Sequence, residues 1–283
     1  MCIFSGRVRH VGATRIFARS SGGEQALVYS MRLGTDEEVA MVLPVPTAQR
    51  AAEEAIRFVN LEDLSGFFEE MDLGFPQSLS LGMTRGAVTG GAPKLAVHEV
   101  GAFEASFVPT RTDFDRLDAR FRLSDAVWAS LPQYRDWGFV VFKLKPGEHR
   151  VHPMAFWFPS RDPDTLYFPT VHVHDGRVKS WAEFDHTLYA QGTLQLATPD
   201  WQRSHGQAAS FMDVDQTRGL VRGDAPCHRR RLVGAADNRD VFVPCGAEPA
   251  VAAPPDAEVP KTPLPEPTTG LFARLAGWLS GKS

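Results

Sequence analysis

Two histidines two residues apart form the densest group of potentially reactive side chains in this sequence. In residues 168–176, Val171 and Val173 alternate with His172 and His174. This alternation has the period of an extended strand, and the Asp-Gly pair that follows favours a turn. Side chains two residues apart in a strand share a face, about 7 Å apart along the chain, so both imidazoles are expected side by side. The pattern indicates a site but names neither a reaction nor a substrate.

Neutral imidazoles are ligands for Zn, Cu, Ni and Fe, so these histidines form a candidate metal site. His152 is a candidate third ligand if its strand pairs with that of His172, and His186 is a candidate fourth. Asp175 or Asp185 is a candidate further ligand, or an acceptor that orients a ring. In the alternative interpretation, the rings lie on a half-exposed sheet face, are hydrogen-bonded or solvated, and bind nothing.

The second candidate group is the cysteine that follows the initiator methionine. Removal of Met1 is expected before a small residue, and it would leave Cys2 with a free amine beside its thiol. The pair supplies a base and a nucleophile, which makes Cys2 the candidate catalytic residue of an N-terminal-cysteine amidohydrolase. Two alternatives stay open. The sulfur of Cys2 joins the histidines as a soft ligand, which favours Cu or Zn as the metal, or Cys2 is a small buried apolar residue.

Composition and charge exclude several classes of protein. The formal net charge of -4 gives no electrostatic reason to expect nucleic acid as a partner. No apolar run of about 18 residues predicts a membrane-spanning helix, and the N-terminus lacks the pattern of a secretory signal. Cys2, Cys227 and Cys245 are too few for a disulfide framework, so we expect reduced thiols and a cytoplasmic location. The chain has no phosphate loop, dinucleotide fingerprint or His-Glu-x-x-His motif.

The composition changes sharply after Gly246. Residues 247–269 are dominated by Pro, Ala, Glu and Thr and are predicted to form a disordered linker. In residues 270–283, leucines recur every four positions from Leu271 to Leu279, which predicts a short amphipathic helix. A helix this short needs a partner, which favours docking to another protein, a compartment shell or a membrane surface. The alternative is a helix that folds back onto its own domain.

Apolar patterns predict several strands in the main domain. Residues 15–18 and 25–31 flank a Ser-Ser-Gly-Gly turn and predict a β-hairpin. Residues 39–43 predict a buried strand that ends at the following prolines. Residues 139–144 and 152–158 predict two strands that pair with each other in antiparallel fashion.

Helices are predicted at residues 47–58 and 61–71, and again after Thr112 and Ser124. The glycine-rich residues 78–93 predict a flexible loop. The sequence leaves residues 181–190 open. The capping-box spacing of Ser180 and Glu183 favours a helix, whereas Phe184, Thr187 and Tyr189 favour a strand.

The segment Val-Leu-Pro-Val-Pro at residues 42–46, between two predicted strands and a predicted helix, resembles a mark of an uncharacterised bacterial domain family. Members, mostly exported, carry a similar segment after a cysteine-containing N-terminus. Residues 134–145 and the following His152-Pro153 are similar to the middle section of that family. The resemblance covers roughly residues 2–189. It implies no activity and no functional residue, and this chain lacks the signal peptide of the exported members.

Together these features predict one α+β domain, residues 1–246, with a mostly antiparallel sheet and several helices. The first function hypothesis is a cytoplasmic metal-binding protein, or a metalloenzyme, whose site contains His172, His174 and His152, with Cys2 or His186. The second is an N-terminal-cysteine amidohydrolase. The third is a non-catalytic binding module that docks through its C-terminal helix.

Overall fold

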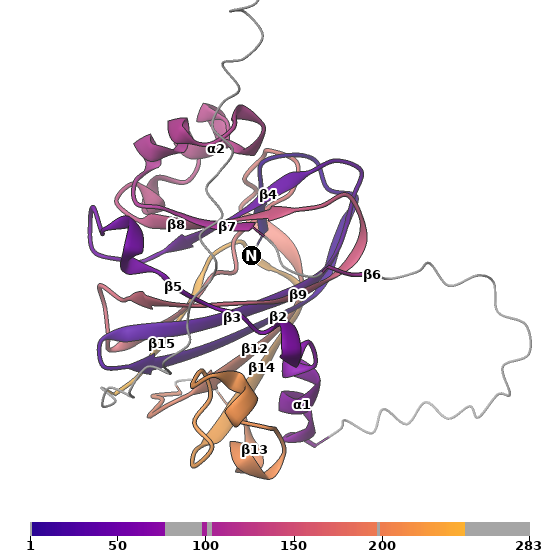
Figure 1. The fold of residues 1–283 in the computed structure, drawn as a ribbon, viewed down its shortest axis with the longest axis vertical. Helices are drawn as coiled ribbons and strands as arrows, with labels where there is room; N and C mark the ends of the chain where they lie inside the picture. Colours follow the sequence, from indigo (N-terminus) through magenta and orange to yellow (C-terminus); the bar gives the residue numbers. More distant parts are fainter. Residues whose placement is uncertain (1, 77–97, 101–103, 197–198, 247–283) are drawn as a thin grey trace, which may run out of the picture.

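A computed structural model describes residues 2–76, 98–100, 104–196 and 199–246 of the chain. The fold is α+β and its sheets are mostly antiparallel, as the sequence predicts (Figure 1). The larger sheet has eight strands, in the order β13, β14, β12, β2, β3, β9, β5, with β6 also beside β9. The bounds of these strands are Gln202–Gln207, Pro226–Asp237, Trp181–Gln191, His10–Ser21, Glu24–Thr35, Gly147–Pro159, Arg57–Val59 and His98–Val100.

The smaller sheet has five strands in the order β11, β1, β4, β8, β7. Their bounds are His172–Val173, Cys2–Phe4, Val39–Val45, Gly138–Leu144 and Glu104–Val108. A third, two-stranded sheet pairs β10 (Thr165–Phe168) with β15 (Val241–Pro244). Three pairs of strands in the described residues are parallel, namely β1 with β11, β12 with β2, and β6 with β9.

The helices of the described residues are short. The two α-helices are α1, Phe67–Leu73, and α2, Asp125–Ala129. The 3-10 helices are η1 Glu53–Ala55, η2 Glu62–Leu64, η3 Arg111–Arg116, η4 Ala119–Phe121, η5 Pro132–Tyr134, η6 Ala208–Ser210 and η7 Asp215–Thr217. Ser124 begins α2 as predicted, because its Oγ accepts a hydrogen bond from the backbone N–H of Val127 at 3.4 Å.

The larger sheet is covered on both faces, which explains why its central strands are apolar along nearly their whole length. One face, with Ile16 and Leu27, belongs to the core that also contains the strands of the smaller sheet. The opposite face, with Phe17 and Val28, packs against α1, where the rings of Phe17 and Phe67 lie 5.8 Å apart. Because successive strand residues point to opposite faces, the same pair of strands contributes side chains to two separate hydrophobic cores. Figure 1 shows α1 and α2 at opposite ends of this stack.

Several predicted elements are confirmed and others are wrong. The hairpin formed by β2 and β3 is confirmed, with Gly22 and Gly23 at positive φ in its turn. The strand at residues 39–43 is confirmed but continues through Pro44 to Val45. Proline is tolerated there because the neighbouring β1 pairs only with Met41 and Val42. No described residue of β1 therefore needs a hydrogen bond from the N–H that Pro44 lacks.

The helix predicted at residues 47–58 is wrong. That segment contains only the 3-10 turn η1 and the start of β5, which pairs with β9. The predicted helix at 61–71 is replaced by η2 and α1, the latter extending to Leu73. Residues 181–190 lie in strand β12, held between β2 and β14, so the strand alternative is the correct one. In these places tertiary pairing overrides local helix propensity.

The pairing predicted between residues 139–144 and 152–158 is also wrong. Strand β8 pairs with β4 and β7 in the smaller sheet, whereas β9 pairs with β3, β5 and β6 in the larger one. The two strands therefore face each other across the core rather than lying side by side. The predicted loop at 78–93, linker at 247–269 and helix at 270–283 lie outside the described residues. Within the described part of the chain, no helix is long and apolar enough to cross a membrane.

Candidate imidazole site

The strand that carries His172 is held on both of its sides. On one side, β11 pairs in parallel with β1, in the register Cys2 to His172 and Ile3 to Val173. On the other side, the amide of Asn238 takes the place of a strand neighbour. The N–H of His172 donates to Asn238 Oδ1 at 2.7 Å, and Asn238 Nδ2 donates back to the carbonyl oxygen of His172 at 3.0 Å. These bonds fix the backbone from which the imidazole of His172 projects.

A half-buried carboxylate fixes the residues just before β11. Asp240 Oδ1 accepts hydrogen bonds from the backbone N–H groups of Thr170 at 2.8 Å and Val171 at 3.2 Å. Its Oδ2 accepts from the hydroxyl of Tyr134 at 2.5 Å and from that of Tyr167 at 3.4 Å. Burial raises the pKa of Asp240 above its ordinary value, and these hydrogen bonds oppose that shift.

Three of the predicted histidines come together between the two sheets. Nε2 of His172, on β11, lies 3.2 Å from Nε2 of His186, on β12. The ring of His172 is stacked on that of His174 at a centroid distance of 5.0 Å and on that of His186 at 4.9 Å. Phe184, two residues before His186 on β12, contacts the ring of His172 at 4.7 Å. We call His172, His174 and His186 the imidazole cluster.

All three imidazoles of the cluster are neutral near pH 7. Burial lowers the pKa of His172 to about 2 and that of His174 to about 4, and it holds the pKa of His186 well below its ordinary value. Repulsion between the rings also lowers the pKa of His186, because a protonated His186 would lie beside His172 and His174. Their lone pairs are therefore available to a Lewis acid without competition from protons.

The cluster is reached from a pocket of about 470 Å³, whose lining includes His172, His174 and Asn238. His186 is 3% exposed and lies behind them. Nε2 of His174 is buried, and it has no hydrogen-bond partner within the described residues. The pocket thus gives a small ligand or ion access to two of the three rings.

The other sequence candidates lie in different surroundings. His152 is buried on β9, where its Nδ1 lies 3.3 Å from the carbonyl oxygen of Pro153. Strands β2 and β3 lie between β9 and β12, so three strand spacings, about 14 Å, separate the backbones of His152 and His186. Asp185 accepts a hydrogen bond from the N–H of Ala13 at 2.8 Å, and Asp175 accepts one from the N–H of Arg177 at 3.2 Å. None of these three side chains belongs to the cluster, although Asp175 lines the 470 Å³ pocket that reaches it.

The three cysteines also differ in their position relative to the cluster. The backbone of Cys2 lies beside that of His172, because the two residues are register partners in a parallel pair of strands. Cys227 and Cys245 are both buried and form no disulfide within the described residues, and burial raises the pKa of Cys227 to about 12. Within the described residues, no three side chains of His, Cys, Asp or Glu are arranged to hold a metal ion.

Sequence reasoning missed the residues that position the cluster. Asn238 and Asp240 precede β15 in a polar segment that has no periodic pattern, so local sequence suggests only a turn there. Their partners in residues 170–172 lie 66 to 70 residues earlier in the chain. The strand propensity of Phe184 is visible in the sequence, but its contact with the imidazoles is not.

Comparisons with known proteins give little further information. No family model matches this chain, and no curated protein matches it. Among solved structures, the chain is similar to the crystal structure of baculovirus P35, with 13% sequence identity and a TM-score of 0.48. That alignment covers 86% of this chain and 99% of the other. We take no residue role and no activity from it.

Proposed function

We propose that this chain binds a transition metal, Zn or Cu, through His172 and His186. The observation that supports this is the 3.2 Å separation of their Nε2 atoms. Two imidazole nitrogens that bind one tetrahedral Zn ion at about 2.0–2.1 Å are separated by about 3.3 Å. An ion placed between the two atoms would replace the hydrogen bond that they now share.

The electrostatics of the cluster favour a metal over a proton. Because burial keeps the imidazoles neutral, metal binding does not require the release of protons from these rings near neutral pH. Imidazole nitrogen suits Zn and Cu, as it does Ni and Fe. The ring of Phe184 excludes water from one side of His172, which strengthens the interaction of an ion with its ligands.

Two protein ligands are too few for a stable site, so the proposal needs at least one more. His174 is the nearest candidate in the described residues, because its ring stacks on that of His172 and its Nε2 is available. Its ring would have to turn to bind the same ion, since the three side chains are not arranged around one point. Cys2 is the other candidate, on the ground of its register beside His172. A thiolate would make the site softer and would favour Cu or Zn over harder metals.

Metal analysis of untagged protein tests the proposal. The protein is produced with ample metal and purified without chelator, and its Zn and Cu are measured by elemental analysis. We expect close to one ion per chain, with most of it lost in His172→Ala and His186→Ala. The control is His205→Ala, since His205 is exposed on β13 and outside the cluster. A parent protein without stoichiometric transition metal would overturn the proposal.

Cobalt substitution identifies the third ligand. A thiolate ligand gives an intense near-ultraviolet charge-transfer band with Co²⁺, whereas a site of imidazoles alone does not. Loss of such a band in Cys2→Ser would assign the sulfur as a ligand. If the parent shows no such band and His174→Ala loses the ion, His174 is the third ligand instead.

We also propose a second candidate function, an N-terminal-cysteine amidohydrolase. The specific observation in its favour is that the backbone of Cys2 is the register partner of His172, a residue of the imidazole cluster. Intact mass must then show Cys2 as the first residue. A thiol-directed reagent should label it, and labelling should persist after dialysis against a chelator. A mass that retains Met1 excludes this candidate and leaves the metal proposal standing.

A further inference from the structure

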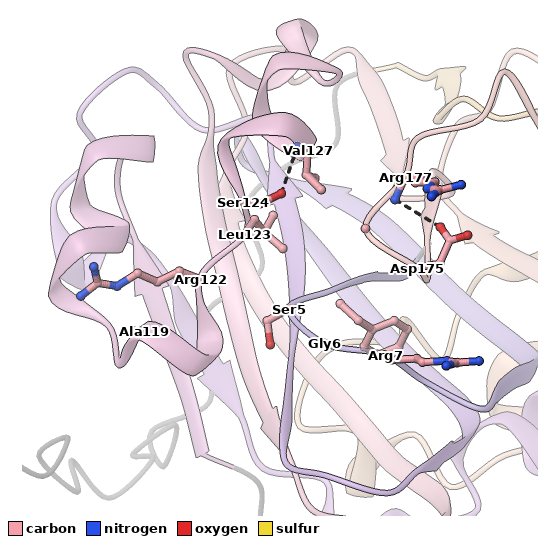
Figure 2. A pocket seen from close by; sticks show the side chains of 12 residues that line it. Ser5, Gly6, Arg7, Ala119, Arg122, Leu123, Ser124, Val127, Asp175 and Arg177 are labelled. Atoms are coloured by element: carbon pink, nitrogen blue, oxygen red, sulfur yellow. Dashed lines mark hydrogen bonds between the residues drawn. The ribbon is translucent and has the colours of Figure 1, made fainter.

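A second pocket, next to the one that reaches the imidazole cluster, has a volume of about 700 Å³. Its walls come from three separate segments (Figure 2). These are the end of β1 with the loop that follows it, the stretch from η4 into α2, and the turn after β11. Since the three segments belong to different parts of the sequence, the pocket exists only in the folded chain.

Two arginines stand at the boundary of both pockets. Arg7 and Arg177 line the 700 Å³ pocket and also the 470 Å³ pocket that contains His172 and His174. Both side chains are exposed. Within the described residues, neither guanidinium makes a hydrogen bond or an ion pair. A guanidinium offers five N–H donors in a planar fork that matches carboxylate and phosphate oxygens.

The third arginine of the pocket differs from these two. The guanidinium of Arg122 donates from Nε to the carbonyl oxygen of Leu117 at 2.8 Å and from Nη2 to that of Asp115 at 2.7 Å. Figure 2 shows its side chain extending away from Arg7 and Arg177. Arg122 therefore stabilises its own loop, whereas the other two guanidiniums keep their hydrogen-bonding capacity for a ligand.

Negative charge in the pocket is already compensated. Asp175 is the one carboxylate among its lining residues, and Lys179 Nζ lies 3.8 Å from Asp175 Oδ2. The backbone N–H of Arg177 also donates to Asp175 Oδ1. The smaller pocket has a second carboxylate, Glu183, in its lining, but Arg7, Arg177 and Lys179 still give that lining a net positive charge.

Three large apolar side chains form another part of the wall of the larger pocket, beside Ser5 and Ser124. Phe4 at the end of β1 lies on one side, and Leu123 and Val127 at the start of α2 lie on another. All three belong to the hydrophobic core, so the surfaces that they present to the pocket are rigid. An apolar group of a ligand placed there would gain burial free energy while its anionic group remained at the arginines.

We propose that the two pockets bind an organic anion in which a carboxylate or phosphate group is attached to an apolar group. The anionic group binds Arg7 and Arg177, and the apolar group lies against Phe4, Leu123 and Val127. This inference does not depend on the metal, because neither arginine belongs to the imidazole cluster.

Titration calorimetry with defined probes tests the charge requirement. The probes are phenyl phosphate, 4-phenylbutyrate, its neutral amide 4-phenylbutanamide, and inorganic phosphate. We expect one or both of the organic anions to bind, the neutral amide to bind at least about tenfold more weakly, and affinity to fall as NaCl is raised. Comparison of the two organic anions decides between phosphate and carboxylate. Equal binding of the amide and the acid would overturn the proposal.

Variants locate the site. Arg7→Ala combined with Arg177→Ala should weaken the better anion at least about tenfold, and the double Lys variant should restore part of the affinity. Arg9→Ala is the control, because Arg9 is paired with Asp36 at 3.0 Å and with Glu148 and lies outside both pockets. Affinity that is unchanged in the double Ala variant overturns the proposal, as does an equal loss in the control.

A third variant tests the apolar wall. Val127→Thr replaces one methyl group by a hydroxyl of similar size, so it should weaken binding of the organic anion while binding of inorganic phosphate stays unchanged. Melting temperatures confirm that each variant is folded. The titrations are repeated after dialysis against a chelator, and we expect the same affinities. The same arginine variants should retain whatever metal the parent holds, so failure of either proposal can be recognised without reference to the other.

Discussion

His172 and Asn238 exchange two hydrogen bonds in the manner of neighbouring strand residues, although only one of them contributes its backbone. Asn238 Nδ2 also donates to the carbonyl oxygen of Lys179 at 2.9 Å. One amide side chain thus joins β11 to the segment that leads into β12, the strand that carries His186. The geometry of the imidazole cluster depends on this contact, because β11 contains only two residues and has a strand neighbour on one side alone.

The first prediction concerns Asn238→Ala. It removes three hydrogen bonds of a half-buried amide, so we expect the free energy of unfolding to fall by about 1–3 kcal/mol, measured by urea denaturation. The control is Asn60→Ala, which removes a single exposed bond to the N–H of Glu62 and should cost less than about 1 kcal/mol. Equal effects of the two variants would show that Asn238 does not hold β11 in place.

The second prediction concerns the loss of folding stability at acidic pH. The pKa values of His172, His174 and His186 in the folded chain lie below the value of about 6.5 expected for unfolded chains. As the pH falls below about 6.5, the unfolded chain takes up protons that the folded chain does not. The contribution of the cluster to stability is therefore complete above that pH and is lost progressively toward about pH 4 and below. Each proton adds a slope of at most about 1.4 kcal/mol per pH unit.

Urea denaturation at several values between about pH 7.5 and about pH 4.5 measures this slope. His186→Asn should reduce it by the contribution of one proton, whatever its effect on absolute stability. An identical slope in the parent and in His186→Asn would be inconsistent with a neutral buried cluster.

The third prediction concerns a buried cation. Arg19 is 0% exposed, donates from Nε to the carbonyl oxygen of Leu220 at 2.8 Å and from Nη2 to that of Gly219 at 2.7 Å, and lies over the ring of Trp157. The single ammonium group of lysine cannot make both of these hydrogen bonds in the geometry of the planar guanidinium. Arg19→Lys should therefore lower the free energy of unfolding by about 2 kcal/mol or more.

Arg57 provides a matched control for Arg19. Its guanidinium also lies over Trp157, but the side chain is half-buried and paired with Glu24 at 3.0 Å. Arg57→Lys should cost less than about 1 kcal/mol, because a partly exposed ion pair contributes little. If Lys at both positions were equally tolerated, the two carbonyl contacts of Arg19 would contribute nothing measurable.

The fourth prediction concerns the C-terminal residues. The described domain closes at Cys245 and Gly246, whose N–H groups donate to the carbonyl oxygens of Asp164 at 2.7 Å and Thr193 at 2.8 Å. Truncation after Gly246 should therefore leave the melting temperature nearly unchanged. We expect it to abolish co-purification with a partner protein, shell or membrane fraction, and Leu275→Glu in the full chain should have the same effect. A fall of several degrees in either variant would favour a helix that packs on its own domain.

Local pattern was enough to predict the fold class, the β2–β3 hairpin and the closeness of the imidazoles of His172 and His174. Strand alternation and glycine turns act over only a few residues, so they can be recognised in the sequence. It was not enough for residues 47–58, where alanines at helical spacing favoured a helix. Ile56 is instead 7% exposed and packs into the core, and the next residues pair with β9. Contacts with distant strands decided that segment.

The site shows the same division. The sequence by itself determined which side chains could act as ligands, since imidazole, thiol and carboxylate chemistry belongs to the residue type. Only the tertiary structure decided which of them meet. His186 joined the cluster because β12 is a strand of the larger sheet that faces β11 of the smaller one, whereas His152 was placed three strands away. The physical reason is that strand order and register depend on hydrogen bonds and core packing between residues far apart in the chain, and no local period records them.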